Sequence, residues 1–278
     1  YHKYGTHIFH TSINSVWEYL KDFTNFNSYR HQVLARFKNK IYQLPINLET
    51  INNFFKKNFT PSEAKKFILK ETIKFSKIQK INFEVKAKSQ IGEKLYNAFI
   101  KNYTYKQWGK NPKELPASIF NRLPLRFDYN ESYFKNALVQ GIPKDGYTKI
   151  FERLVDSPYI DIIYNYNYEY DNAHEVKYLT IYTGPLDKLL NNKFGKLDWR
   201  SLKFKKQIIN CEDFQGTSVI NFPEKKYKFT RIHEPRHLHV ERNYGKKTLI
   251  LKEFPAVDNN EPYYPINDIQ NRSRHKKY

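Results

Sequence analysis

The chain has 278 residues, 40% of them hydrophobic, which is enough for one large domain or two to three small ones with a buried core. Lysine and arginine number 48 against 28 acidic residues, and the resulting net charge of +20 raises the question of an anionic partner. A single cysteine, Cys211, excludes an intrachain disulfide framework and favours a reducing, cytoplasmic setting, and no apolar run is long enough for membrane insertion.

The positive charge has two interpretations. It can mark a nucleic-acid surface, or it can reflect a compositional bias combined with a local anion site. Lysines are scattered through nearly every segment, and neither a long basic run nor a nucleic-acid recognition motif accompanies them. We therefore favour a local anion site and expect no nucleic-acid partner.

The first part of the chain predicts helices next to a pair of strands. Residues 12–23 have the period of a short amphipathic helix, and residues 31–48 read as two strands with a proline at the edge or end. The clearest helix start is at Pro61, with Thr60 as N-cap and Glu63 completing a capping box.

A further helix is predicted from Ser89 to Gly109, because apolar residues recur there at steps of four. Its stripe consists of Ile91, Leu95, Phe99 and Tyr103. The proline- and glycine-rich residues 113–146 that follow are expected to form a mobile, loop-rich stretch containing Arg122.

The second half of the chain predicts one helix and then mainly strands. Residues 147–154 have a helical period, while 160–170 and 176–187 are expected to be strands. From Leu197 to Phe254 the pieces "LDWRSLKF", "TSVINF", "KKYKFTRI", "RHLHV" and "TLILKEF" predict an antiparallel sheet, and the terminal "NRSRHKKY" is polar enough to fray. Because helices group with helices and strands with strands, we expect an α+β or mixed α/β fold.

Rings and cations alternate in "FIKNYTYKQWGKNPKELPAS", residues 99–118. Phe99 and Tyr103 lie on the apolar stripe, so both can be core residues. The same rings, with Thr104 and Trp108 beside them, also suit stacking on a planar base, which is worth roughly 1–3 kcal/mol per base.

Arginine is scarce relative to lysine in this chain, and its guanidinium suits bidentate anion binding. The arginines that stand out are Arg122, Arg126, Arg200, Arg231 and Arg236. Each can form an ordinary surface salt bridge. Arg231 is the best candidate for an anion site, because it shares strand parity with Tyr227 and Phe229 and can face a cleft with them.

Other chemistries find little support. The histidines at positions 7, 10, 233, 237 and 239 lack a zincin helix or accompanying thiolates, so we expect no metal. There is no Gly-x-Ser-x-Gly elbow, no P-loop and no Gly-x-Gly-x-x-Gly fingerprint, and Cys211 has no evident base. The residues alone therefore predict an aromatic, arginine-lined site for a nucleotide-like anion.

The stretch "FIKNYTYKQWGKNPKELPASIFNRLPLRF" closely resembles UDP-galactopyranose mutases. Further landmarks in the family's order include "YGTHIFHT", "GIPKDGYTKIFE", "YTGPLDKLLNNKFGKLDWRSLKF", "FTRIHEPRHLH" and "EPYYPIND". The resemblance implies an isomerase that interconverts UDP-galactopyranose and UDP-galactofuranose through a covalent adduct of the sugar with reduced FAD. It also implies a cytoplasmic homodimer that serves galactofuranose-containing surface glycans.

The resemblance also implies roles for individual residues. His7 would lie near the flavin ring as a cofactor-binding and catalytic residue. Arg122 would swing onto the substrate diphosphate, and Arg231 would hold that diphosphate permanently. The remaining substrate-binding residues would be Phe99, Tyr103, Thr104 and Trp108 on the uridine side, with Tyr103 stacking on uracil, and Tyr133, Asn221 and Tyr264 near the diphosphate.

The domain organisation implied by the resemblance is discontinuous. It comprises a remnant of an FAD-binding α/β domain (1–30), sheet strands (31–48), a helical bundle (49–118), a substrate loop and strand (119–140), a return segment of the FAD domain (141–196), an antiparallel sheet domain (197–256) and the start of a C-terminal FAD-domain segment (257–278). The family's N-terminal glycine-rich FAD segment and its C-terminal flavin contacts have no match, so we expect a fragment that is inactive alone.

Two rival hypotheses stay open at this point. A noncatalytic nucleotide- or RNA-binding protein could use the same rings and the +20 charge. An amine-oxidase-like flavoprotein can share the "TGP" feature, but it would not explain the diphosphate arginines or the rings from Tyr103 to Trp108.

Overall fold

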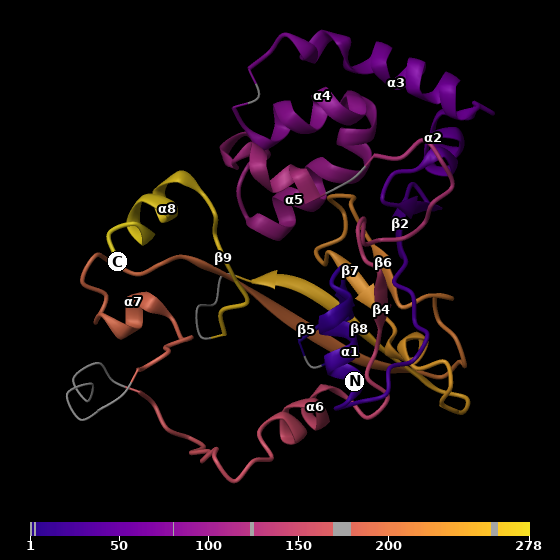
Figure 1. Cartoon of the computed structure of the whole chain (residues 1–278). Helices are drawn as coiled ribbons and strands as arrows, with labels where there is room; N and C mark the ends of the chain where they lie inside the picture. Colours follow the sequence, from indigo (N-terminus) through magenta and orange to yellow (C-terminus); the bar gives the residue numbers. More distant parts are fainter. Residues whose placement is uncertain (1, 3, 80, 123–124, 169–178, 257–260) are drawn as a thin grey trace.

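The computed structural model describes residues 2, 4–79, 81–122, 125–168, 179–256 and 261–278. A helical bundle packs at one end of a twisted sheet, so the fold is mixed α/β (Figure 1). The helices before residue 125 are α1 (Asn14–Lys21), α2 (Leu48–Phe55), α3 (Pro61–Ser76), α4 (Phe83–Leu95), the π-helical turn η1 (Tyr96–Ile100), α5 (Lys101–Trp108) and the 3-10 turns η2 (Pro112–Glu114) and η3 (Ala117–Arg122). Those after it are α6 (Tyr147–Leu154), α7 (Leu186–Leu189), the 3-10 turn η5 (Pro235–Leu238) and α8 (Ile269–His275).

The main sheet has seven strands in the order β3-β2-β6-β7-β8-β5-β9. They are β2 (Val33–Phe37), β3 (Lys40–Leu44), β5 (Trp199–Ile209), β6 (Val219–Asn221), β7 (Arg231–His233), β8 (Thr248–Ala256) and β9 (Tyr264–Pro265). A separate antiparallel pair joins β1 (Phe9–Thr11) to β4 (Val139–Gly141). The antiparallel sheet predicted between residues 197 and 254 is confirmed, because β5 pairs with β8, β6 with β7 and β7 with β8, each in antiparallel fashion. Strand β2 from the first part of the chain joins this sheet through a parallel pair with β6.

The predicted capping box at the start of α3 is confirmed. The Thr60 hydroxyl accepts from the Glu63 amide, while Glu63 accepts from the Thr60 amide, with Pro61 in the first turn. The predicted start of the next helix at Ser89 is wrong, because α4 already begins at Phe83, where the Asn82 side chain caps its first turn. Its predicted end at Gly109 is confirmed by a left-handed C-cap.

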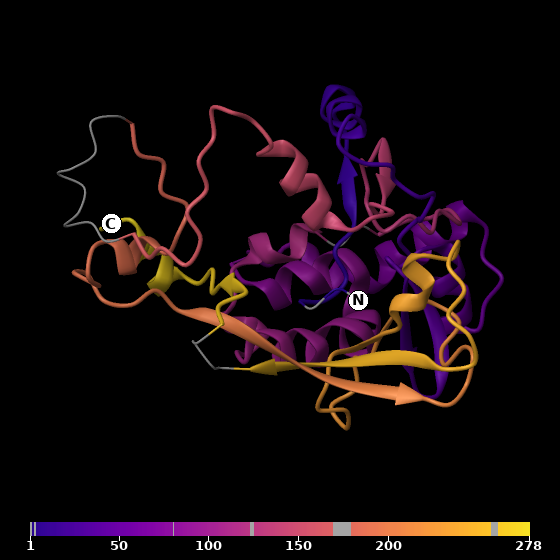
Figure 2. The same cartoon turned by 90° about the horizontal axis from the view of Figure 1, so that it is seen from below.

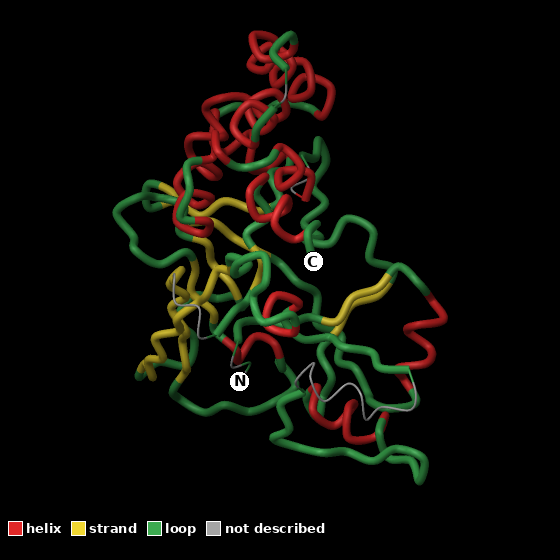
Figure 3. The backbone as a smooth tube through the Cα atoms, turned by 90° about the vertical axis from the view of Figure 1, so that its left-hand side faces the viewer, coloured by secondary structure: helices red, strands yellow, loops and turns green. Residues whose placement is uncertain are grey.

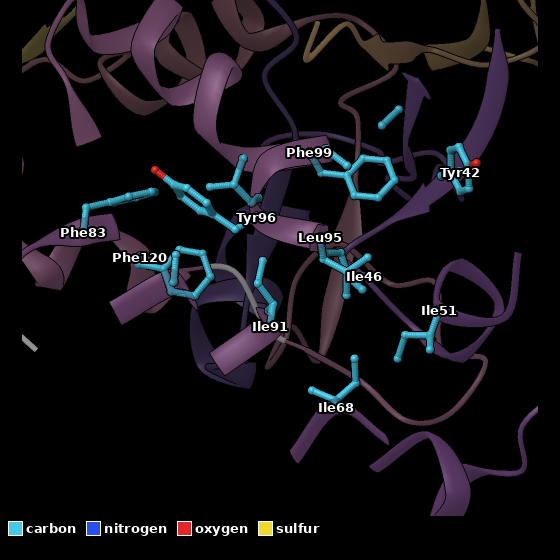
Figure 4. Packing of buried hydrophobic residues seen from close by; sticks show 14 of the residues in the cluster. Tyr42, Ile46, Ile51, Ile68, Phe83, Ile91, Leu95, Tyr96, Phe99 and Phe120 are labelled. Atoms are coloured by element: carbon cyan, nitrogen blue, oxygen red, sulfur yellow. The ribbon is translucent and has the colours of Figure 1, made fainter. Parts of the chain in front are cut away.

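One hydrophobic core joins the bundle to the first hairpin (Figure 4). Phe99 is 3% exposed and its ring lies 5.1 Å from Tyr42 of β3 and 5.6 Å from Phe37 of β2. Ile91 and Leu95 of the predicted stripe are buried beside it. The stripe therefore faces the core, and it fixes the bundle against β2 and β3.

The two strands predicted between residues 160 and 187 are wrong for the part of the chain that the structure describes. Residues 160–168 and 179–184 contain no strand and run as an extended loop between α6 and α7 (Figure 1). Tyr159, Leu179 and Ile181 are 93%, 88% and 80% exposed. An alternating pattern forms a strand only where a neighbouring strand accepts its hydrogen bonds, and none of the described strands pairs with these residues. Residues 169–178 lie outside the described chain.

Three further predictions in the second half differ from the structure. "RHLHV" is not a strand, because Pro235 lacks an amide hydrogen and begins the turn η5 instead. "KKYKFTRI" is extended only over Arg231–His233, since its first residues close the loop after β6. The polar terminus does not fray but forms α8, where the Asp268 side chain caps the first turn.

The long strands β5 and β8 run side by side along one side of the molecule, with the bundle helices behind them (Figure 2). From the side, the bundle helices lie together at the top of the molecule, above most of the strands (Figure 3). None of the described helices is long and apolar enough to cross a membrane.

Candidate functional site

A cavity of about 250 Å³ lies where α5 meets the ends of β6 and β7. Seven of the residues singled out in the sequence line it, namely Phe99, Tyr103, Thr104, Trp108, Tyr133, Asn221 and Arg231. They come from four separate stretches of the chain, so the fold assembles them. We call it the ring-and-arginine cavity.

Helix α5 provides one wall of this cavity. Tyr103 and Thr104 lie in its middle, and Trp108 lies at its last turn, beside the left-handed Gly109. The Trp108 ring packs edge-on against Tyr264 of β9 at 5.4 Å, and the Tyr264 hydroxyl donates to the Gln107 carbonyl at 3.4 Å. Tyr264 therefore supports the wall from outside rather than lining the cavity.

Strands β6 and β7 provide the opposite wall. Asn221 and Arg231 are direct partners in the antiparallel pair, and so they lie next to each other. Arg231 Nη2 donates a short hydrogen bond to the Tyr103 hydroxyl, with the guanidinium 5.8 Å from the centre of the ring. The two walls therefore meet through a cation and a phenol ring.

A buried carboxylate stands behind Arg231. Glu253 of β8 has an exposed fraction of 4%, and its Oε1 lies 3.1 Å from Arg231 Nε. Burial opposes ionisation, but Arg231 and His233 outweigh it and hold the pKa of this carboxyl below its usual range. The carboxylate keeps the guanidinium in place and compensates its charge.

Glu253 also connects the cavity to the N-terminal loop. Its Oε2 lies 2.9 Å from His233 Nε2, and His233 Nδ1 lies 2.7 Å from the Thr6 hydroxyl. Burial lowers the pKa of His233 and outweighs the attraction of Glu253, so the ring is neutral. Since a carboxylate only accepts, Nε2 carries the hydrogen and Nδ1 accepts from Thr6.

His31 is a lining residue that the sequence did not indicate. It is 7% exposed, and its Nδ1 lies 3.0 Å from the Tyr29 hydroxyl, which in turn lies 2.5 Å from the Ser218 hydroxyl. Burial, followed by the charge of Arg231, lowers the pKa of His31 to about 3. His31 is therefore a neutral polar group beside the arginine.

His7 lies in a second, larger cavity of about 1010 Å³. Its amide donates to His2 Nδ1 at 2.9 Å and its carbonyl accepts from the Tyr147 hydroxyl at 3.2 Å. Arg236 lines the same cavity, and its Nη1 is buried without a hydrogen-bond partner among the described residues. The guanidinium stacks 5.7 Å from the Tyr244 ring. We call it the His7 cavity.

Arg122 ends η3, and its side chain lies outside the part of the chain that the structure describes. The structure therefore brings seven of the ten predicted residues into one cavity, places His7 in another and sets Tyr264 behind Trp108.

One histidine lies beside two carboxylates. His237 Nε2 lies 3.1 Å from Asp213 and 3.6 Å from Glu234. Glu234 also accepts from the amides of Phe214 and Gln215 and from the Thr248 hydroxyl, at 2.6–3.0 Å. These bonds give Glu234 a structural role in tying the loop after β5 to η5.

Sequence reasoning missed Glu253 and His31. It considered His233 only as a metal ligand and rejected that role, while the interaction of His233 with Glu253 depends on residues distant in sequence. Lys106 was visible as part of the stretch of rings and cations that drew attention to α5, but its contacts with the loop after β6 were not.

Together, the mixed α/β fold and the ring-and-arginine cavity define a protein suited to a nucleotide-like anion. Comparison with known proteins is more specific, and the chain belongs to the UDP-galactopyranose mutase family of isomerases. The family model "GLF: UDP-galactopyranose mutase" matches residues 98–278.

Relatives match the chain over its whole length. A probable UDP-galactopyranose mutase of Klebsiella pneumoniae is 37% identical and is covered over 71% of its length. The dTDP-fucopyranose mutase of Escherichia coli is 35% identical, with 74% covered, and the UDP-galactopyranose mutase of Mycoplasma genitalium is 30% identical, with 73% covered. The predicted resemblance is confirmed.

A solved structure, titled "Crystal structure of reduced UDP-Galactopyranose mutase", shares the fold. The TM-score is 0.67 at 14% sequence identity, over 93% of this chain. The chain spans 64% of that solved chain.

Proposed function

We propose that the protein interconverts UDP-galactopyranose and UDP-galactofuranose with the help of reduced FAD. The observation that carries this proposal is the joined pair of Tyr103 and Arg231, which presents a ring and a guanidinium to one cavity. A uracil ring and a diphosphate require these two groups side by side. Membership of the family supports the sugar and the reaction.

The uridine would lie against the α5 wall, with Tyr103 stacked on uracil. Phe99 would support this ring from the core, while Thr104 and Trp108 complete the wall. Thr104 is buried, so its hydroxyl is a fixed donor and acceptor that can read the edge of the base.

The diphosphate would lie against the strand wall, held by Arg231 with Asn221 and Tyr133 nearby, while Tyr264 would act only through its support of Trp108. When the bond between the anomeric carbon and the diphosphate breaks, negative charge grows on the departing phosphate. A guanidinium fixed in advance by Glu253 stabilises that charge without having to reorganise. Arg122 would add a second guanidinium from the end of η3 and exclude water from the site as it moves onto the diphosphate.

The His7 cavity suits FAD. It is large and is lined by rings that include Tyr147 and Tyr244. The buried Nη1 of Arg236 has no hydrogen-bond partner among the described residues, so it can donate to an oxygen of the ligand. Reduced FAD, when bound, supplies the nucleophile that displaces UDP from the anomeric carbon. His7 would contact the flavin ring, and the bond from Thr6 to His233 would hold its loop in place.

Further aspects follow the family and are proposed on that basis alone. We infer a homodimer in the cytoplasm that supplies galactofuranose for surface polysaccharides, and that binds neither nucleic acid nor a metal.

A second substrate deserves a direct comparison, because the chain is 35% identical to a dTDP-fucopyranose mutase. Both nucleotides carry a pyrimidine and a diphosphate, so the pair of Tyr103 and Arg231 suits either. Discrimination between the UDP sugar and the dTDP sugar therefore depends on contacts with the hexose and with the ribose or deoxyribose.

The test is turnover of UDP-galactofuranose and of dTDP-fucofuranose, with and without dithionite, by the protein purified in its natural full length. We expect conversion of the UDP sugar to the pyranose only under reducing conditions. Faster conversion of the dTDP sugar would assign the second substrate instead. Turnover of neither, by protein carrying bound flavin, would refute the proposal, and tight RNA binding with a steep salt dependence would then favour the noncatalytic alternative.

A further inference from the structure

Lys106 joins the two walls of the ring-and-arginine cavity. It lies on α5, one turn after Tyr103, but its side chain leaves the helix for the loop that connects β6 to β7. That loop runs from Phe222 to Thr230, so its two ends carry Asn221 and Arg231. Lys106 therefore contacts the connection between the two strand residues of the cavity.

The loop folds around the ammonium group. Lys106 Nζ lies 2.5 Å from the carbonyl oxygen of Phe222, 2.9 Å from that of Phe229, 3.1 Å from that of Tyr227 and 3.2 Å from that of Glu224. The four carbonyls are spread over residues 222–229, so the contacts extend over most of the loop, and they share the three hydrogens of the ammonium group. A side chain that lacks several donors cannot make the contacts that Lys106 makes.

Rings close the loop around this centre. Phe222, Tyr227 and Phe229 contact one another with centroids 4.8–5.4 Å apart. The carbonyls turn inward to Lys106 while the rings pack together, so the loop has one ordered shape. Burial lowers the pKa of Lys106 to about 8, while Glu224 raises it, so the ammonium is charged at neutral pH.

Two contacts from one helix thus hold the strand wall. Tyr103 accepts from Arg231 at the end of the loop, and Lys106 binds the loop itself. With both in place, the loop and the start of β7, which carries Arg231, cannot move away from α5 without breaking bonds between Lys106 and the loop carbonyls, and hydrogen bonds to a charged group are each worth about 1.5–3 kcal/mol.

We propose that Lys106 is a positioning residue that sets the spacing between the uridine wall and Arg231, and thereby the affinity for a nucleoside diphosphate. The proposal rests on the proposed function, since it takes UDP as the ligand that spans both walls. Lys106 does not touch the ligand in this account.

A purely structural role for Lys106 would have a different signature. If Lys106 only stabilised the fold, its loss would lower the melting temperature and reduce the affinity for every ligand of the cavity alike. If Lys106 sets the spacing, its loss reduces the affinity for UDP far more than that for uridine, because UDP needs both walls and uridine needs only the α5 wall.

The test compares three variants by calorimetric titration with UDP and with uridine. Lys106→Met keeps the length of the side chain without its donors, Lys106→Arg keeps charge and donors, and Lys101→Met is the control, because Lys101 is exposed on the same helix. We expect Lys106→Met to lower the affinity for UDP roughly tenfold or more and the affinity for uridine less than twofold. For UDP alone this is a loss of at least about 1.4 kcal/mol of binding free energy. Lys106→Arg should recover most of the UDP affinity, and Lys101→Met should match the wild type.

Amide hydrogen exchange provides a readout that needs no ligand. In Lys106→Met, the amides of residues 222–233 should exchange faster while those of α5 stay protected. Unchanged exchange there, or equal losses for UDP and uridine, would overturn the proposal. A wild-type protein that does not bind UDP would refute the proposed function instead, and the exchange result would still decide whether Lys106 holds the loop.

Discussion

Acid should destabilise the fold through His31. Its pKa is about 3 in the folded protein, against about 6.5 in an unfolded chain. The unfolded state therefore binds more protons below pH 6.5, so the stability contributed by neutral His31 is complete above that pH and is lost as the pH falls toward 3. Between pH 7.5 and pH 5.0 these two values give a loss of about 2 kcal/mol from this residue.

The perturbation that isolates this effect is His31→Phe, which keeps a ring beside Tyr133 and cannot take up a proton. Urea unfolding followed by tryptophan fluorescence at pH 7.5 and 5.0 gives the free energy of unfolding for both proteins. Between pH 7.5 and pH 5.0 the free energy of unfolding of the variant should fall by about 2 kcal/mol less than that of the wild type. This holds even if the variant is less stable at pH 7.5 because Tyr29 loses its hydrogen-bond partner.

His237 provides a control of opposite sign. The carboxylate of Glu234 at 3.6 Å, together with that of Asp213 at 3.1 Å, raises the pKa of His237, so the stability that His237 contributes is present at low pH and is lost as the pH rises through the folded value. His237→Asn should therefore make the acid loss larger. If His31→Phe lost as much stability as the wild type on acidification, the assignment of a neutral, buried His31 would be wrong.

Three other substitutions test the site and its support. Tyr103→Phe removes the hydroxyl that Arg231 binds and should weaken UDP by about 1.4 kcal/mol, or tenfold, in a titration; unchanged affinity would remove Tyr103 from the diphosphate side. Glu253→Gln leaves the buried arginine without its anion, and the free energy of unfolding in urea should fall by about 3–5 kcal/mol, whereas a change near zero would show that the pair is dispensable. Gly109→Ala places a methyl group 2.8 Å from Arg200 Nη1 at a positive φ of 65°, so the melting temperature should fall; an unchanged value would mean that Arg200 moves aside freely.

Local chemistry accounts for what the sequence predicted well. Thr60, Pro61 and Glu63 interact within one turn, so the start of α3 needs no knowledge of the rest of the fold. Gly109 likewise ends α5 through its own backbone conformation. The apolar stripe was recognisable because Phe99 and Tyr103 lie four residues apart. In the structure Phe99 lies on η1 and Tyr103 on α5, and both side chains face the inside of the protein.

Partners distant in sequence account for what was missed. The alternation in residues 160–168 suits a strand, but strand formation depends on a neighbour that the alternation does not specify. Glu253 gave no signal, because its partners Arg231 and His233 lie on another strand. The parallel pairing of β2 with β6 was also invisible, since it joins Leu34 to Ile220 across most of the chain.

That parallel pairing has a consequence for biosynthesis. Among the described residues, the core around Phe99 consists of residues between Ala35 and Phe127, so the bundle and first hairpin can fold as soon as this part leaves the ribosome. Strand β6 emerges roughly 100 residues later, which at usual elongation rates is a delay of about 5–20 s. During that interval the outer edge of β2 is open and can pair wrongly with another nascent chain. We expect chains stalled near residue 130 to hold a protease-resistant bundle that aggregates through this edge until β6 closes it.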